Sequence, residues 1–182
     1  VSELVAPVSL TASGISSKSV LLNWVSPFTQ NPIIGFKLFR NDVEIGETNE
    51  LYYLDTGLTA DTEYVYTVCA VDAEGNTTDK AIPLTVKTAA PVIRSVAFPS
   101  VVIGGDRNEI VTELEQKMLL SEMNVAFYSG DTLKYSEKIP LQDASLSTVA
   151  HHLDLSKLTD GEYTVLVTVT DADGVSAEKK TT

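Results

Sequence analysis

The chain has 182 residues, of which 43% are hydrophobic and 21% charged, a composition typical of a packed globular protein rather than a disordered one. Residues 1–89 contain 5 basic and 11 acidic side chains and residues 90–182 contain 8 and 14, so each half carries −6 of the net charge of −12. An evenly acidic surface argues against binding to nucleic acid or to anionic membranes.

Seven short runs of alternating apolar and polar residues, each bounded by turn residues, predict seven strands in the first half. These runs are residues 8–13, 19–25, 33–40, 43–48, 52–55, 63–72 and 81–87. So many short strands with frequent turns are typical of a β-sandwich.

The run at residues 63–72 has two distinct faces. Strand periodicity predicts that its aromatic face, formed by Tyr64, Tyr66, Val68 and Ala70, packs in the core. The opposite face includes Cys69, the single cysteine, which we expect to be partly exposed on a sheet surface and able to form a dimer under oxidation. No His or basic residue adjoins Cys69 in sequence to lower its pKa, so a nucleophilic role is not expected.

A family pattern runs through these strands. Residues 20–24 (VLLNW) have the form of a second strand with a central Trp, and residues 34–40 look like a third strand with Phe36 at a position that usually holds Tyr. Leu58, Tyr64 and Gly75 follow at the spacing of a tyrosine corner and a hairpin glycine. With these residues, positions 5–88 resemble the fibronectin type III family, which implies that Tyr64 is a structural residue whose hydroxyl binds loop backbone.

Residues 87–91 (KTAAP) predict the domain boundary, because a proline ends one strand run and a new run at 92–98 follows at once. We therefore expect two domains, residues 1–89 and 90–182. So short a linker predicts an elongated pair with modest flexibility.

The second half repeats features of the first. Tyr64 and Tyr163 each precede a glycine, Gly75 or Gly174, by eleven residues. Residues 125–131 and 158–174 resemble bacterial Ig-like modules, which implies a second β-sandwich over about residues 91–180. Residues 109–123 fit a helical period as well as a strand period, and we expect strands there because a sandwich needs its second strand in this place. The predicted fold class is all-β, with two tandem sandwiches.

Two clusters could carry chemistry, and both have a simpler interpretation. His151 and His152 are adjacent, so on a strand they point to opposite faces and cannot converge on one metal ion; we expect one on the surface and one at a sheet rim. Asp171 and Asp173 resemble the start of a calcium loop but lack its later ligands, and glycine with acidic residues also suits a tight turn. No catalytic, cofactor-binding or metal-binding residue is therefore predicted.

The sequence favours a non-catalytic, monomeric spacer or accessory segment of a larger extracellular or cell-surface bacterial protein, whose partners are the neighbouring domains. An alternative is a module that binds polysaccharide or a protein partner through exposed aromatic rings, with Phe28, Tyr52 or Tyr53, Tyr128 and Tyr135 as candidates. A third is adhesion by strand addition at an open sheet edge. The charged residues within 178–182, which end the last strand of the second domain, normally discourage such pairing.

Overall fold

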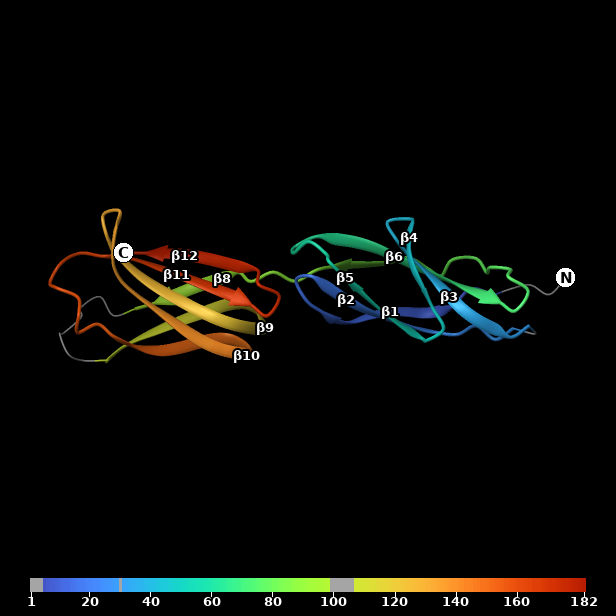
Figure 1. Ribbon diagram of the computed structural model, residues 1–182, viewed down its shortest axis with the longest axis horizontal. Coiled ribbons are helices and arrows are strands. Elements are labelled where there is room, and N and C mark those ends of the chain that lie inside the picture. The colour runs from blue at the N-terminus through green and yellow to red at the C-terminus, as the bar shows by residue number, and fades with distance from the viewer. Residues whose placement is uncertain (1–4, 30, 99–106) are drawn as a thin grey trace. The chain divides into compact units, whose positions relative to one another are not determined.

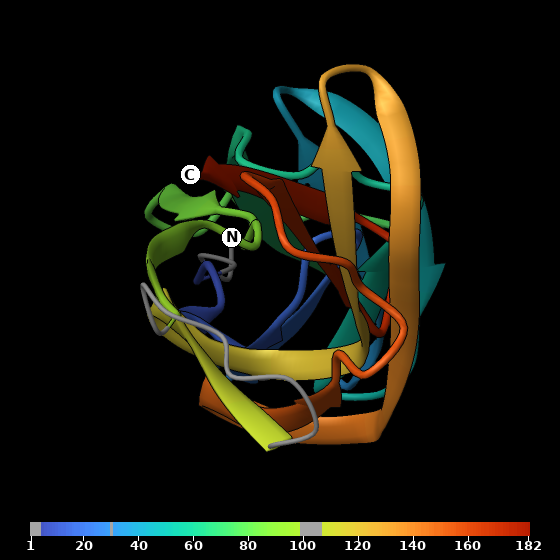
Figure 2. The ribbon, with the colours of Figure 1, turned by 90° about the vertical axis from the view of Figure 1, so that its left-hand side faces the viewer.

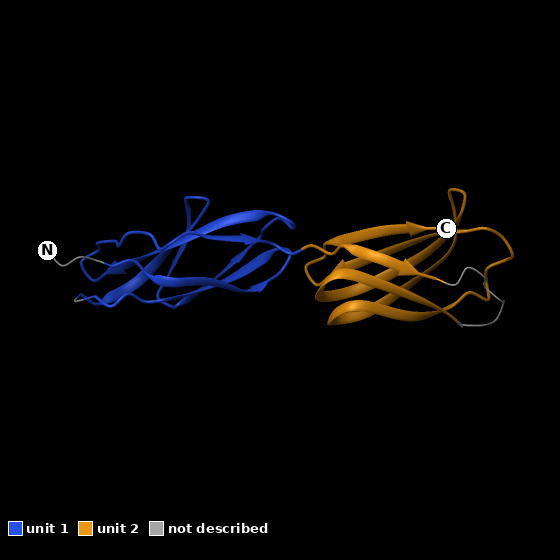
Figure 3. Ribbon diagram, turned by 180° about the vertical axis from the view of Figure 1, so that it is seen from behind, with its two compact units in different colours: residues 1–89 blue, residues 90–182 orange. Residues whose placement is uncertain are grey.

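A computed structural model of the chain describes residues 5–29, 31–98 and 107–182. Over these residues the regular structure consists of strands β1 to β12, without a helix. The described part of the chain accordingly has no helix that could cross a membrane. The chain divides into two compact units, Val1–Ala89 and Ala90–Thr182 (Figure 3). The predicted all-β fold class is confirmed.

Unit 1 consists of two antiparallel sheets (Figure 1). One sheet has the order β1-β2-β5, with β1 at Val8–Ile15, β2 at Ser19–Val25 and β5 at Tyr52–Thr56. The other has the order β4-β3-β6-β7, with β4 at Val43–Thr48, β3 at Ile33–Arg40, β6 at Glu63–Asp72 and β7 at Leu84–Lys87. The structure confirms these strands but starts β7 three residues later than predicted, just after Pro83, whose missing N–H suits a position outside the ladder.

The core of unit 1 lies between the two sheets. Trp24 from β2 and Phe36 from β3 pack edge to face, with their ring centroids 5.4 Å apart. From β6, Tyr66, Val68 and Ala70 are fully buried, and Tyr64 packs against them half-buried, as the aromatic face of this strand predicted. The other buried core residues are Val20, Leu22, Leu38, Leu58, Ala81 and Val86.

Both units contain a tyrosine whose hydroxyl binds loop backbone. The Tyr64 hydroxyl accepts a hydrogen bond from the Thr59 N–H at 3.0 Å, and the Tyr163 hydroxyl donates one to the Thr159 carbonyl at 2.7 Å. These contacts confirm that Tyr64 is a corner residue and that the segment ending in Tyr163 corresponds to the segment ending in Tyr64. Both tyrosines act as scaffold, since their hydroxyl groups are engaged.

Over its described residues, unit 2 has five strands, of which two are 23 residues long. They are β8 (Ile93–Ala97), β9 (Arg107–Ser129), β10 (Thr132–Asp154), β11 (Thr164–Asp171) and β12 (Ser176–Thr181). The first part of β9 pairs with β8 and its last part with β11, while β10 pairs along most of β9. β9 and β10 therefore run through both layers of the unit, and Figure 2 shows how they curve around it.

The long strands bend where their pairing is irregular. The register of β9 and β10 shifts between Pro140 and Ala144 and again between Leu146 and Thr148. Gln142 and Asp143 lie at the first shift with φ of 54° and 55°, in the left-handed region that few non-glycine residues adopt. Such bulges bend a strand and let it turn from one layer into the next.

Residues 109–123 form part of β9, which confirms the strand prediction for this segment. Ile110, Leu114 and Met118 are buried, and their spacing of four is a multiple of two, so it satisfies a strand period as well as a helical one. The polar residue between the first two, Thr112, is also fully buried and obscured the alternation in the sequence. Leu119, which contributed to the helical pattern, is 52% exposed on the outer side.

The two units are joined by very little free backbone. On the unit 1 side, the Ala89 N–H donates to the Ser16 carbonyl at 3.0 Å. On the unit 2 side, the Ala90 carbonyl accepts from the Gln116 amide at 3.1 Å, and the Val92 carbonyl accepts from a β9 N–H. Each side of the joint is thus fixed to its own unit, and Pro91 further restricts the backbone between them.

Candidate functional site

The two Asp-Gly segments are turns held by carboxylate oxygens. Asp171 Oδ1 accepts hydrogen bonds from the N–H groups of Asp173 at 3.0 Å and Val175 at 2.8 Å. Asp72 Oδ1 accepts the equivalent pair from Glu74 at 3.0 Å and Asn76 at 2.8 Å. The glycines, Gly174 and Gly75, have φ of 78° and 85°, as such turns require.

These contacts confirm the interpretation of the segments as turns. A hydrogen bond from the Asn76 side chain lowers the pKa of Asp72. Burial acts in the opposite direction, but hydrogen bonds from backbone N–H groups add to the lowering, so the pKa stays below its ordinary value. No group of three or more His, Cys, Asp or Glu side chains in the described residues is arranged to hold a metal ion.

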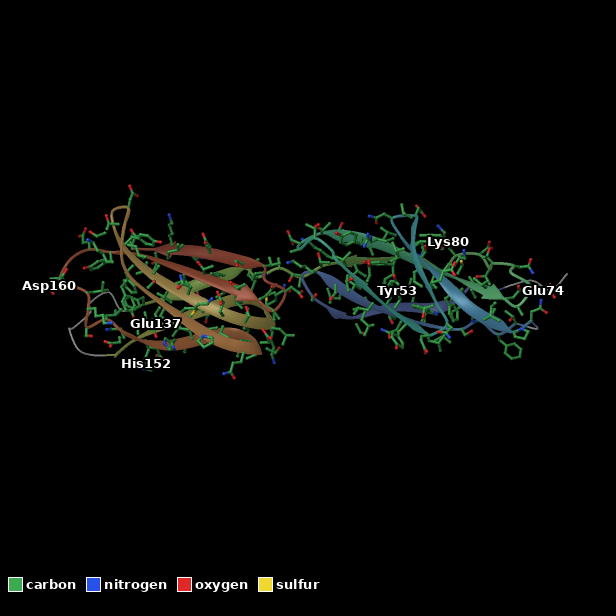
Figure 4. All side chains as sticks on the ribbon, in the orientation of Figure 1. Tyr53, Glu74, Lys80, Glu137, His152 and Asp160 are labelled. Carbon is green, nitrogen blue, oxygen red and sulfur yellow. The ribbon has the colours of Figure 1, made fainter. Side chains whose placement is uncertain are left out.

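His151 belongs to a polar cluster at the edge of unit 2. On β10 it alternates with the buried Val149 and Leu153, so it faces inward at the rim, and His152 faces outward and is exposed (Figure 4). This arrangement confirms that one histidine lies at the surface and the other at the rim. His151 Nε2 lies 2.9 Å from Glu137 Oε1, and the Tyr135 hydroxyl donates to the other oxygen of Glu137.

The cluster links the two ends of one bent strand. Tyr135 and Glu137 come from the first part of β10 and His151 from the last part, so the contacts join the two arms of the bent strand. Burial raises the pKa of Glu137, but hydrogen bonds from Tyr135 and His151 outweigh burial and hold that pKa below its ordinary value. Burial, followed by the bond to Glu137, raises the pKa of Tyr135. The cluster is a carboxylate held by two hydrogen bonds in a structural contact.

A pocket of about 750 Å³ lies at one end of unit 2. Aromatic rings line it, and among them the ring centroids of Phe127 and Tyr163 are 6.4 Å apart. Asp160, labelled in Figure 4, and Glu162 also line it. The Tyr163 hydroxyl is engaged in the corner, so the pocket offers ring edges and carboxylates but does not contain His151 or Glu137.

The aromatic candidates for ligand binding differ widely in exposure. Phe28 is 97% exposed and Tyr52 53% exposed. Tyr53 is turned inward, and its hydroxyl donates to the Ile45 carbonyl at 3.0 Å. Tyr135 is engaged with Glu137, and Tyr128 borders the pocket of unit 2. The structure therefore leaves Phe28 and Tyr52 as the rings most available to a ligand.

The predicted partial exposure of Cys69 is wrong, because this side chain is only 4% exposed. It lies on β6 opposite Lys37 of β3, and the next pair on the same face of the sheet joins Thr67 to Phe39. The long neighbouring side chains cover the small thiol, and the Lys80 amino group lies 4.0 Å from the centroid of the Phe39 ring on the same sheet. Burial raises the pKa of Cys69, which makes the thiol inert.

A buried ionic network in unit 1 escaped the sequence reasoning. Asp55 is 6% exposed, and both of its oxygens accept hydrogen bonds from Arg40 Nη1, at 3.0 and 2.9 Å. The fully buried Tyr66 donates to Asp55 Oδ2 at 2.7 Å. Asp55 comes from one sheet and Arg40 and Tyr66 from the other, so the network joins the two layers. In the sequence, the feature that could have indicated this network is Asp55 itself, an acidic residue at an inward-facing position of a short strand.

Comparison with known proteins identifies the first unit. Residues 5–87 match the family model of the fibronectin type III domain. Exoglucanase B of Cellulomonas fimi is 35% identical over 84 residues, which make up 46% of this chain and 8% of the exoglucanase. Chitinase Chi52 of Paenibacillus xylanexedens is 37% identical over 83 residues, 46% of this chain and 16% of the chitinase. The matched segment is thus a small part of each of these relatives.

Among solved structures, a segment of two fibronectin type III domains from chicken tenascin covers 97% of this chain and 99% of its own, with 14% identity and a TM-score of 0.41. The assignment of unit 2 to an Ig-like family stays a prediction. The strands, the core tryptophan, the tyrosine corner and the family match together show that residues 5–87 form a fibronectin type III domain.

Proposed function

We propose that this chain is a non-catalytic accessory segment that separates the functional modules of a larger extracellular bacterial enzyme acting on polysaccharide. The observation that carries the proposal is the place of the matched domain in its relatives, where it accounts for 8% of an exoglucanase and 16% of a chitinase. A domain that forms so small a part of an enzyme, and whose buried carboxylates, Asp55 and Asp72, are engaged in structural contacts, suits a supporting role.

The joint between the units supports the same role. A spacer has to limit the rotation of its parts, and a flexible linker would not do so. The Ala89 N–H is bound to unit 1 and the Ala90 carbonyl to unit 2, so few backbone torsions remain between them. Pro91 removes part of the remaining freedom.

NMR relaxation of the backbone amides tests this proposal. In a spacer with a restricted joint, both units should tumble with one common rotational correlation time. Inserting Gly-Gly-Ser between Ala89 and Ala90 should separate the two correlation times and lower both. Independent tumbling in the unmodified chain would contradict the spacer role, because the joint would then be flexible.

Small-angle scattering provides a second test. An elongated monomer is expected, with the same scattering curve in the presence of calcium and of a chelator, because the Asp171 carboxylate oxygen already binds turn backbone. Stiffening or association that depends on calcium would contradict this expectation. It would instead favour an adhesive role with a cation at Asp171 and Asp173.

A further inference from the structure

One sheet of unit 1 carries almost no charge. Across β1, β2 and β5, Asp55 is the single Asp, Glu, Lys or Arg, and it points into the core, where it binds Arg40. By contrast, every strand of the other sheet contains charged residues. On that sheet, Lys37 forms two ion pairs, with Glu44 at 3.6 Å and with Glu47 at 2.9 Å. The outward side of the β1-β2-β5 sheet is thus uncharged in a chain whose net charge is −12.

We define the uncharged face by six outward side chains of this sheet: Val8, Leu21, Asn23, Val25, Tyr52 and Leu54. Strand register makes them neighbours, because Leu21 pairs with Leu54, Asn23 with Tyr52 and Val8 with Val25. Four of them, Val8, Val25, Tyr52 and Leu54, are between 51% and 54% exposed. A contiguous patch of half-exposed apolar side chains on a small domain is a marker of an interaction surface.

The uncharged face combines three kinds of group. Tyr52 contributes an aromatic ring, and the inward orientation of its neighbour Tyr53 shows that strand alternation fixes Tyr52 on the outside. Leu54 and Leu21 contribute aliphatic surface beside that ring. Asn23 contributes an amide, which is held in place because its Nδ2 donates to Ser13 Oγ at 2.8 Å on the adjacent strand.

We propose that the uncharged face docks the accessory segment on an uncharged polysaccharide. This inference rests on the proposed function, since it names the substrate class with which the segment would be in contact. Sugar rings offer C–H groups that stack on an aromatic ring and hydroxyl groups that bind amides, and both are present on the face. A neutral polymer can approach this acidic chain without electrostatic repulsion, whereas a second copy would bring another −12 of charge.

Binding to insoluble, uncharged polysaccharides tests the inference. The purified chain is mixed with microcrystalline cellulose or chitin, and the fraction retained is measured across protein concentrations. Leu54→Glu places a charge in the face and Tyr52→Ala removes the ring; each should weaken retention at least about fivefold, the loss expected for a residue central to an interface. Val65→Glu is the matched control, because Val65 is 40% exposed on the other sheet. It should leave retention unchanged.

Each outcome decides the inference. Circular dichroism is used to check that each variant is folded. If Leu54→Glu does not fold, the retention of Tyr52→Ala by itself tests the proposal. Equal retention of all variants would overturn the proposal, because another surface would then bind. Absence of retention for the unmodified chain would overturn it too, while the NMR test of the joint would still report on the spacer role. Self-association of the chain that Leu54→Glu abolishes would show that a second copy occupies the face, and would also overturn the proposal.

Discussion

Removing one hydroxyl from the buried network of unit 1 should lower its stability measurably. In Tyr66→Phe, Asp55 loses the hydrogen bond of 2.7 Å from the phenol but keeps both bonds from Arg40. A hydrogen bond to a charged group contributes about 1.5–3 kcal/mol, and because Arg40 still compensates the charge we expect a loss of about 2 kcal/mol. For a domain of this size, that corresponds to a fall in Tm of roughly 8–16 °C.

Tryptophan fluorescence can follow unit 1 selectively, because the single tryptophan of the chain, Trp24, lies in its core. Urea unfolding of Tyr66→Phe is compared with that of Tyr52→Phe, in which the altered ring is about half-exposed. The control should change the free energy of unfolding by no more than about 0.5 kcal/mol. If the two variants had the same stability, the network would not stabilise the domain and the reasoning would be refuted.

The same variant has a pH dependence with a defined sign. Burial, followed by the hydrogen bond to Asp55, raises the pKa of Tyr66 in the folded protein. The resulting stability is fully present below the pKa of the unfolded chain, at about 10, and is lost as the pH rises toward the folded value. The difference in unfolding free energy between the unmodified chain and Tyr66→Phe should therefore narrow by about 1 kcal/mol between pH 9 and pH 11. A constant difference would contradict this assignment.

Three further predictions address other contacts. In Gly46→Ala the new Cβ would lie 2.5 Å from the Tyr53 hydroxyl, so urea unfolding monitored by tryptophan fluorescence should show a loss of about 1–3 kcal/mol. Glu137→Gln should lower the stability of unit 2 by about 1 kcal/mol at neutral pH, as measured by circular dichroism. This difference should begin to shrink as the pH falls through the pKa of Glu in the unfolded chain, at about 4.3, and should be lost once the pH is below the lowered pKa of folded Glu137. Cys69 should not react with a thiol reagent until unit 1 unfolds, and rapid labelling of the native chain would contradict its burial.

Strand alternation made most of unit 1 predictable. The sequence predicted the bounds of β2, β3, β4 and β6, and the aromatic face of β6, because each alternating run ends at a turn residue. Alternation predicts which face of a strand a side chain lies on, but not whether neighbouring side chains bury it there. The predicted exposure of Cys69 was therefore wrong, because this residue is buried on the outer face of its sheet, opposite Lys37 of β3.

Contacts between distant segments were not predictable from local pattern. The ion pair of Asp55 with Arg40 joins residues from different sheets, and no spacing rule indicates such a pair. In unit 2, the adjacency of His151 and His152 predicted that the two side chains face opposite ways, but the partner of His151, Glu137, lies fourteen residues away in sequence. Only the bend of β10 brings the two side chains together.

The long hairpin of unit 2 has a consequence for folding kinetics. β9 and β10 meet at a tight turn, where Ser129 pairs with Thr132 and Gly130 has a φ of 58°. From this turn, each further pair closes only a small loop, so the hairpin can form as a zipper with little entropic cost at each step. The pairing of β11 with β9 joins residues much farther apart in sequence, such as Leu120 and Asp171, and has to follow. Unit 2 is therefore expected to nucleate at its hairpin turn, before β11 and β12 add to the sheet.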